Sequence, residues 1–122
     1  MSHQKINLGK SGETLAANYL LNKGYKILER NFRAGKLGEI DLVCRDPDKK
    51  TIVFVEVKTR HNLNYGWPEE SITYLKLEHL YAAVEMYLTK NKINNTPFRI
   101  DAISIIKING RQPSIRHIKN LN

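Results

Sequence analysis

The stretch Gly38-Glu-Ile-Asp-Leu-Val-Cys-Arg45, followed by Thr51-Ile-Val-Phe-Val-Glu-Val-Lys58, decides the fold of this chain. Both segments are rich in β-branched and aromatic residues, which favour strands. The residues between them, Asp46-Pro-Asp-Lys-Lys50, are typical of turns, so we expect an antiparallel hairpin. Apolar side chains occupy both alternating sets of positions in these strands. This pattern indicates a sheet covered by helices on both faces, as in an α/β layered domain.

The segment before the hairpin begins with a predicted helix. Apolar residues from Leu15 to Leu20 recur at helical spacing. We therefore expect a helix over about residues 11–23, with Ser11 as its N-cap and with a loose start over residues 1–9.

The remaining elements follow from the same periodicities. In chain order they are a strand over residues 25–33, a long amphipathic helix over about 69–89, a strand over 98–107 and a short edge strand over 114–118. Together with the hairpin, the predicted order is helix, three strands, helix, strand.

Length and composition indicate one globular domain that spans residues 1–122. Hydrophobic residues make up 41% of the chain and charged residues 26%, which excludes the disordered and collagen-like classes. No apolar run approaches the roughly 20 residues that span a bilayer, and the start lacks the apolar segment of a secretory signal. The single cysteine, Cys44, can form neither an internal disulfide nor a thiolate metal site. We therefore expect a cytoplasmic protein without a membrane partner.

The charge of the chain favours a polyanionic partner. Twenty Lys and Arg residues against 12 Asp and Glu residues leave a net charge of +8. Such an excess attracts phosphates and is typical of nucleic-acid-binding proteins, although it also serves solubility alone. The charge by itself indicates no chemistry.

Charged residues interrupt the two central strands. Glu39 and Asp41 are two positions apart, so they point to one face of their strand. Glu56 and Lys58 have the same spacing in the next strand. Opposed positions of an antiparallel hairpin have a constant sum of residue numbers, and a two-residue turn at Asp48-Lys49 makes that sum 97. Asp41 is then directly opposite Glu56.

Two carboxylates placed this closely repel each other. At about 4 Å and an effective dielectric constant near 20, the repulsion is roughly 4 kcal/mol. The fold tolerates such a pair if a cation binds, if a proton is shared, or if Lys58 neutralises the charge. Mg²⁺ prefers carboxylate, water and phosphate oxygens and suits the first option. In the alternative, Glu56 and Lys58 are exposed at a strand end and form ordinary cross-strand pairs.

The same residues carry a resemblance to a known family. Gly38-Glu-Ile-Asp41 followed by Val55-Glu-Val-Lys58 resembles the PD-(D/E)XK nuclease signature, in which one strand supplies an Asp and the next supplies Glu-x-Lys. More narrowly, the chain is similar to the YraN family of small bacterial proteins, whose fold resembles that of archaeal Holliday-junction resolvases. The other segments that carry this similarity are Gly12-Glu-Thr-Leu-Ala-Ala-Asn-Tyr19, Gly24-Tyr-Lys-Ile-Leu28 and Arg99-Ile-Asp101. The resemblance implies a restriction-endonuclease-like αβββαβ core with a mixed central sheet flanked by helices.

The resemblance also implies roles for individual residues. Asp41 and Glu56 would ligate Mg²⁺ or Mn²⁺, with the Val57 carbonyl as a third oxygen. Lys58 would be the catalytic lysine. Glu13 matches the acid in the family's first helix and would reach the metal through water. Its alternative role is that of an acid placed favourably near a helix N-terminus.

Three further positions, Glu39, Ile40 and Asp101, bear on how well the chain fits the family pattern. Glu39 either faces the site or is a solvated charge at a strand end. Ile40 stands where the superfamily signature has Pro, which weakens the specificity of the pattern. Asp101 matches an Arg-x-Asp of the family, and we expect it to pair structurally with Arg99 or with a helix end.

Basic and aromatic residues near these segments are candidates for nucleic-acid contacts. The residues that could hold phosphates are Arg33, Lys36, Arg45, Arg60 and Lys76. Each of them singly is also explained as a solvated surface charge. In YraN-like sequences the stretch after Thr73 is strongly basic, whereas residues 77–79 are Leu, Glu and His here. Tyr65 and Trp67 could stack on bases, although packing against a core edge is the preferred interpretation.

Three functional hypotheses follow. The first is a metal-dependent nuclease that hydrolyses phosphodiester bonds of DNA or RNA, with DNA favoured. The second is a nucleic-acid-binding domain with little or no catalysis of its own. The third is an interaction module that keeps these acids for structure alone. A homodimer is compatible with all three, because so small a chain has little surface for a large substrate.

Overall fold

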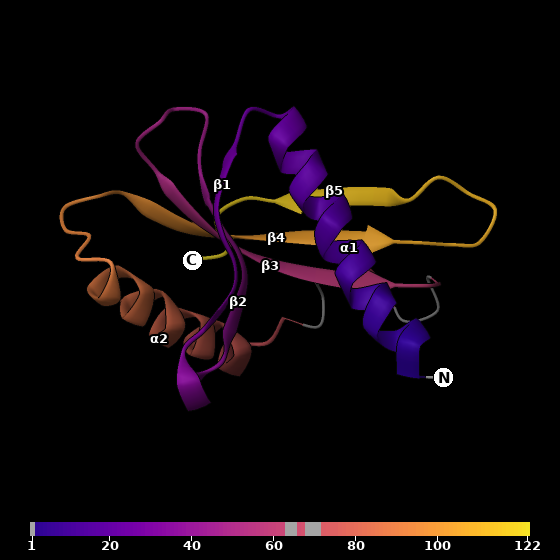
Figure 1. The fold of residues 1–122 in the computed structure, drawn as a ribbon, viewed down its shortest axis with the longest axis horizontal. Helices are drawn as coiled ribbons and strands as arrows, with labels where there is room; N and C mark the ends of the chain where they lie inside the picture. The colour runs from indigo at the N-terminus through magenta and orange to yellow at the C-terminus, as the bar shows by residue number, and fades with distance from the viewer. Residues whose placement is uncertain (1, 63–65, 68–71) are drawn as a thin grey trace.

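The computed structural model describes residues 2–62, 66–67 and 72–122 (Figure 1). In chain order its elements are α1 (Ser2–Asn22), β1 (Lys26–Arg33), the short 3-10 helix η1 (Gly35–Leu37), β2 (Glu39–Arg45), β3 (Ile52–Arg60), α2 (Tyr74–Lys90), β4 (Phe98–Ile106) and β5 (Ser114–Ile118). The strands form one sheet in the order β1-β2-β3-β4-β5. Only β3 and β4 pair in parallel, and α2 makes the crossover between them. The predicted α/β fold with a mixed sheet is confirmed, including the short edge strand at the end of the chain.

The sheet is covered on both faces, as the double apolar pattern of its strands predicts. Figure 1 shows α1 lying diagonally across β3, β4 and β5, with α2 packed elsewhere on the sheet. On the α1 face, Leu20 packs with Leu42 and Val55 of the sheet. On the other face, Val84 of α2 packs with Phe54. No helix within the described part of the chain has both the length and the apolar composition that crossing a membrane needs.

The first helix is longer than predicted. We expected a loose start over residues 1–9 and a helix over about 11–23, but α1 already begins at Ser2. The helix includes Gly9 and Gly12, and an internal glycine costs a helix only about 1 kcal/mol. Ser11 is not the N-cap, because it lies inside the helix and its hydroxyl accepts a 2.8 Å hydrogen bond from Lys107.

The second helix is shorter than predicted. Its expected start near residue 69 lies outside the described residues, and residues 72–73 are not helical. Thr73 has an extended backbone, and its hydroxyl accepts a 3.2 Å bond from the backbone N–H of Lys76. This N-cap starts α2 at Tyr74 and places Lys76 in the first turn of the helix.

The β2–β3 turn is wider than the predicted two residues but keeps the predicted register. The backbone N–H of Asp46 bonds the carbonyl of Thr51 at 2.9 Å, which encloses a loop over residues 47–50. The carboxylate of Asp48 accepts hydrogen bonds from the backbone of Lys50 and Thr51, and these bonds lower its pKa to about 2. The residue numbers of Asp46 and Thr51, the pair that closes the loop, also add to 97, so the hairpin register is the predicted one.

The β1–β2 ribbon changes face in its middle. Ile40 and Leu42 are two positions apart, yet Ile40 packs on the α2 face and Leu42 on the α1 face. Asn31 of β1 has a left-handed backbone with φ of +54° and lies opposite Asp41 in the register. Figure 1 shows β1 and β2 running across the direction of β3–β5. The reversal therefore occurs at the position that carries the predicted metal ligand.

Candidate metal centre

The paired strands separate at the candidate site. The β2–β3 ladder has the predicted sum of 97 and ends at the pair Leu42–Val55. The next positions, Asp41 and Glu56, therefore lie where β2 leaves β3. From there, β3 continues in parallel pairing with β4 alone, up to Arg60. A gap between two strands inside a covered sheet leaves room for side chains, so both acids occupy a position suited to a ligand site.

Asp41 bridges this separation. Its Oδ2 accepts a 2.7 Å hydrogen bond from the backbone N–H of Val57. Burial and then the nearby charge of Glu56 raise the pKa of the Asp41 carboxyl to about 7. Glu13 and Glu39 raise this pKa further, and the Val57 bond opposes them. A carboxyl that holds its proton near neutral pH is one that a divalent cation would ionise.

Glu56 is buried and only partly satisfied. Its side chain is 5% exposed, and its Oε1 lies 3.4 Å from Nζ of Lys58 and 3.6 Å from Nζ of Lys76. Its Oε2 is buried without a hydrogen-bond partner among the described residues. A buried carboxylate oxygen without a partner costs free energy. The ion pair confirms that Lys58 offsets the charge of Glu56, while Oε2 is an oxygen that a cation could bind.

Two acids from two elements lie beside Asp41. One oxygen each from Glu13 of α1 and from Glu39 and Asp41 of β2 lie within 4.8 Å of one another. Their side chains are half-buried. Hard divalent cations prefer such carboxylate oxygens, so the residues present fit Mg²⁺ or Mn²⁺. Glu56, which the sequence predicts as a metal ligand, is not a member of this group of three. Glu39, for which the sequence left open a solvated position, is a member.

A close contact between α1 and β3 positions Glu13. Gly12 is buried in α1, and a Cβ atom at this position would collide with Oγ1 of Thr59. Only glycine allows this approach of helix to strand. The next residue along the helix is Glu13, so the contact brings its carboxylate to the sheet.

Asn31 is the site residue that the sequence did not indicate. With its nitrogen facing the acids, its carboxamide donates a 2.9 Å bond to Oε1 of Glu39 and 3.1 Å bonds to both carboxylate oxygens of Glu13. No motif distinguishes this asparagine from the others in the chain. The only signal in the sequence is the tolerance of asparagine for left-handed backbone, which becomes informative once the register is known.

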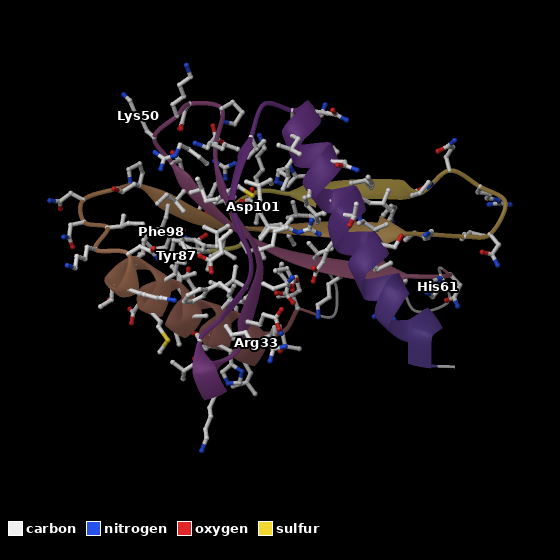
Figure 2. The ribbon with its side chains drawn as sticks, viewed as in Figure 1. Arg33, Lys50, His61, Tyr87, Phe98 and Asp101 are labelled. Atoms are coloured by element: carbon white, nitrogen blue, oxygen red, sulfur yellow. The ribbon has the colours of Figure 1, made fainter. Side chains whose placement is uncertain are left out.

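The predicted basic residues do not all gather here. Lys76 contacts Glu56, and Arg33 pairs in register with Glu39. Arg45 lies at the other end of β2, about 13 Å from Asp41 along an extended strand. Figure 2 shows Arg33 near the end of the ribbon that leads to η1.

Three further candidates, Lys36, Arg60 and Trp67, lie within the described residues. Lys36 lies in η1, and Arg60 ends β3, where its carbonyl accepts a bond from Lys107. Tyr65 lies outside the described residues. The guanidinium of Arg116 lies 4.4 Å from the centre of the Trp67 ring, which is a cation–π contact.

Asp101 has the structural role that we expected. It is fully buried in β4 and accepts hydrogen bonds from Arg99 at 3.0 Å, from His117 at 2.8 Å and from the backbone of Asn120 at 2.9 Å. Burial alone would raise the pKa of this carboxyl, but these bonds lower it below its usual value. Arg99 also forms a 2.8 Å ion pair with Asp46. In Figure 2, Asp101 lies in the middle of the sheet.

Comparison with known proteins gives one consistent match. The family described as "Uncharacterised protein family UPF0102" matches residues 12–105. A UPF0102 protein of Clostridioides difficile (strain 630) is 45% identical over 112 residues, which cover 92% of this chain and 93% of the relative. A UPF0102 protein of Clostridium botulinum (strain Loch Maree / Type A3) is 47% identical over 123 residues, with 98% and 97% covered. A UPF0102 protein of Pelobacter propionicus is 42% identical over 114 residues, with 93% and 81% covered.

Proposed function

Because this chain belongs to the uncharacterised protein family UPF0102, whose description names no activity, we propose its function from the site: it is a metal-dependent nuclease that hydrolyses phosphodiester bonds. The observation that carries the proposal is the position of Asp41 beside the buried Glu56, whose Oε2 has no partner among the described residues. A divalent cation would satisfy that oxygen and remove the repulsion between the two acids.

Asp41, Glu13 and Glu39 are the proposed metal residues on one side, and Glu56 on the other. The N–H and C=O of one residue in an extended strand point to the same side. Since the N–H of Val57 bonds Asp41, its carbonyl is also directed toward β2 and remains a candidate ligand. Mg²⁺ or Mn²⁺ bound there would activate water and polarise a phosphate.

Lys58 is the proposed catalytic lysine. Its Nζ lies 3.4 Å from Glu56, and its side chain is 32% exposed, so it can reach a phosphate from solvent while it stays next to the acids. Its ammonium would donate hydrogen bonds to phosphate oxygens as their negative charge increases. Lys76, at the start of α2, is 40% exposed and also contacts Glu56. It would bind a neighbouring phosphate.

Nucleic acid is the proposed substrate class. The net charge of +8 favours a polyanion, and the resemblance to the PD-(D/E)XK signature favours DNA over RNA. The acids of the site would repel a phosphodiester without a cation, so the proposed activity requires the metal.

The experiment is a cleavage assay on labelled single-stranded, duplex and branched DNA and on RNA, in Mg²⁺, Mn²⁺ or chelator. It compares the wild-type protein with Asp41→Ala and Lys58→Ala. Glu85→Ala and Lys50→Ala are the matched controls, since both residues are exposed and Lys50 extends from the β2–β3 turn (Figure 2). We expect metal-dependent cleavage that both site variants lose and both controls keep.

Three other outcomes contradict the proposal in different ways. Salt-sensitive binding of nucleic acid without cleavage would favour a binding domain with little catalysis. Cleavage that persists in Asp41→Ala and Lys58→Ala would identify a contaminating nuclease. If the folded protein neither binds nor cleaves nucleic acid, the remaining hypothesis is the interaction module.

A further inference from the structure

The carboxamide of Asn31 lies against two acids of the candidate metal centre. With its nitrogen toward them, it donates one bond of 2.9 Å to Glu39 and two of 3.1 Å to Glu13. These bonds join α1 to β2 through a residue of β1, and each carboxylate gains a donor. In this orientation the amide joins the two acids through hydrogen bonds to both of them.

The backbone directs this side chain to the acids. Asn31 has φ of +54°, a left-handed conformation that asparagine tolerates better than other residues with a Cβ. It lies opposite Asp41, where the β1–β2 ribbon changes face. A regular strand would direct the side chain of this residue perpendicular to the sheet. The left-handed residue is therefore part of what brings the amide to Glu13 and Glu39.

A carboxamide can present either of two atoms at the same position. Rotation of the terminal group by half a turn replaces the nitrogen with the oxygen and hardly changes its shape. With the oxygen facing Glu13 and Glu39, only acceptors would meet, which is unfavourable unless a cation joins them. Amide oxygens are good ligands for hard divalent cations. The unpartnered Oε2 of Glu56 is an independent sign that a ligand belongs at this centre.

We propose that Asn31 is a residue of the metal centre with two states. Its nitrogen binds Glu13 and Glu39 in the metal-free protein, and its oxygen faces the divalent cation once the cation is bound. The inference rests on the proposed metal-dependent function but concerns metal binding, so it can be measured without any cleavage assay.

The test uses two substitutions that separate the oxygen from the nitrogen. Asn31→Asp keeps an oxygen and the tolerance for a left-handed backbone, but it loses the donor. Asn31→Gly keeps the backbone conformation and loses the whole side chain. Asn95 is the matched control, because it also has a left-handed backbone, with φ of +53°, and is exposed in the connection between α2 and β4. Asn95→Asp and Asn95→Gly measure how much the same substitutions change stability and Mn²⁺ affinity at a left-handed position outside the candidate metal centre.

Affinity for Mn²⁺ is measured by titration calorimetry, and the melting temperature is measured with and without Mn²⁺. We expect Asn31→Gly to bind Mn²⁺ about tenfold more weakly than the wild type. Asn31→Asp should bind Mn²⁺ at least as tightly as the wild type. Its melting temperature should be lower than that of the wild type without metal and should rise more when Mn²⁺ is added. Both Asn95 variants should keep the wild-type affinity.

The results separate this inference from the proposed nuclease. Wild-type affinity in Asn31→Gly would overturn the inference and make Asn31 a turn residue, whether or not the protein cleaves nucleic acid. An equal loss of affinity in Asn31→Asp and Asn31→Gly would show that the donor matters and the oxygen does not, which also overturns it. Failure of the wild type to bind Mn²⁺ overturns it as well. Binding of Mn²⁺ that weakens in Asn31→Gly, without cleavage by the wild type, would contradict the nuclease alone.

Discussion

Oδ2 of Asp41 accepts a 2.7 Å hydrogen bond from the backbone N–H of Val57, two positions beyond Val55, the last residue of β3 that pairs with β2. The bond replaces a ladder hydrogen bond with one from a side chain, so the separated strands stay joined. It also fixes the position of a carboxylate whose pKa is raised by Glu56 and by the acids Glu13 and Glu39. One of the proposed ligand residues therefore also joins the two strands where they separate.

The stability of the metal-free protein should fall as pH rises through the range in which Asp41 ionises. Its pKa is about 7 in the folded protein against an ordinary value of 3.8, so the folded state holds a proton that the unfolded state has released. The difference corresponds to at most about 4 kcal/mol, present at low pH and lost as pH rises to about 7. Urea unfolding at pH 5.5 and pH 8 should show about half of this loss, roughly 2 kcal/mol, in the wild type. Asp41→Asn should reduce it and be the more stable protein at pH 8, and equal slopes in the two proteins would contradict the assignment.

Binding of Mn²⁺ should stabilise the protein more at pH 8 than at pH 6. The cation competes with the proton of Asp41, whose pKa of about 7 lies between these values. Melting curves with Mn²⁺ and with chelator measure the gain at each pH. Glu85→Ala should behave like the wild type, and Asp41→Asn should lose the gain at both pH values. A gain that is independent of pH would indicate that the cation binds elsewhere.

Lys58→Ala should separate catalysis from stability. The ion pair with Glu56 spans 3.4 Å, and the lysine is 32% exposed, so its loss should cost less than about 1 kcal/mol of unfolding free energy. If Lys58 stabilises the charge on a phosphate, cleavage should fall at least about 100-fold. Urea unfolding and the cleavage rate are measured on one preparation. A loss of several kcal/mol would make the lysine a structural residue.

Gly12→Ala should destabilise the protein through Thr59. The added Cβ would collide with Oγ1 of Thr59, so α1 must move away from β3, at a cost of about 2 kcal/mol. Since Glu13 follows Gly12, Mn²⁺ affinity should fall as well. Thr59→Ala removes the colliding oxygen, and the double variant should recover part of the stability. Additive losses in the double variant would refute the contact.

Asp101→Asn should destabilise the fold without a change in metal affinity. The substitution removes a buried charge that is bonded to Arg99 and His117, and we expect a loss of about 3 kcal/mol. Glu85→Gln, at an exposed position of α2, should change stability by less than about 0.5 kcal/mol. Mn²⁺ titration of Asp101→Asn checks the second half of the prediction, since a changed affinity would connect Asp101 to the metal centre.

The hairpin register could be predicted because it depends on local spacing. The turn residues between the two strands fix which positions pair, and the residue numbers of each pair add to 97. This register places Asp41 one position past the Leu42–Val55 pair and therefore near Glu56. The ends of the helices could not be predicted with the same accuracy. We expected a loose start over residues 1–9, yet α1 begins at Ser2, and inside it Gly12 packs closely against Thr59 of β3.

The class of fold, the order of its elements, the register of β2 on β3 and the candidates Asp41, Glu56 and Lys58 could all be predicted from the amino-acid sequence. These features follow from periodicity and from residues close together in the chain. The meeting of Glu13 and Glu39 beside Asp41, and the contact of Asn31 with both, could be seen only in the folded protein. That convergence depends on the reversal of the β1–β2 ribbon and on the close packing of α1, which join distant segments in ways that local periodicity does not encode.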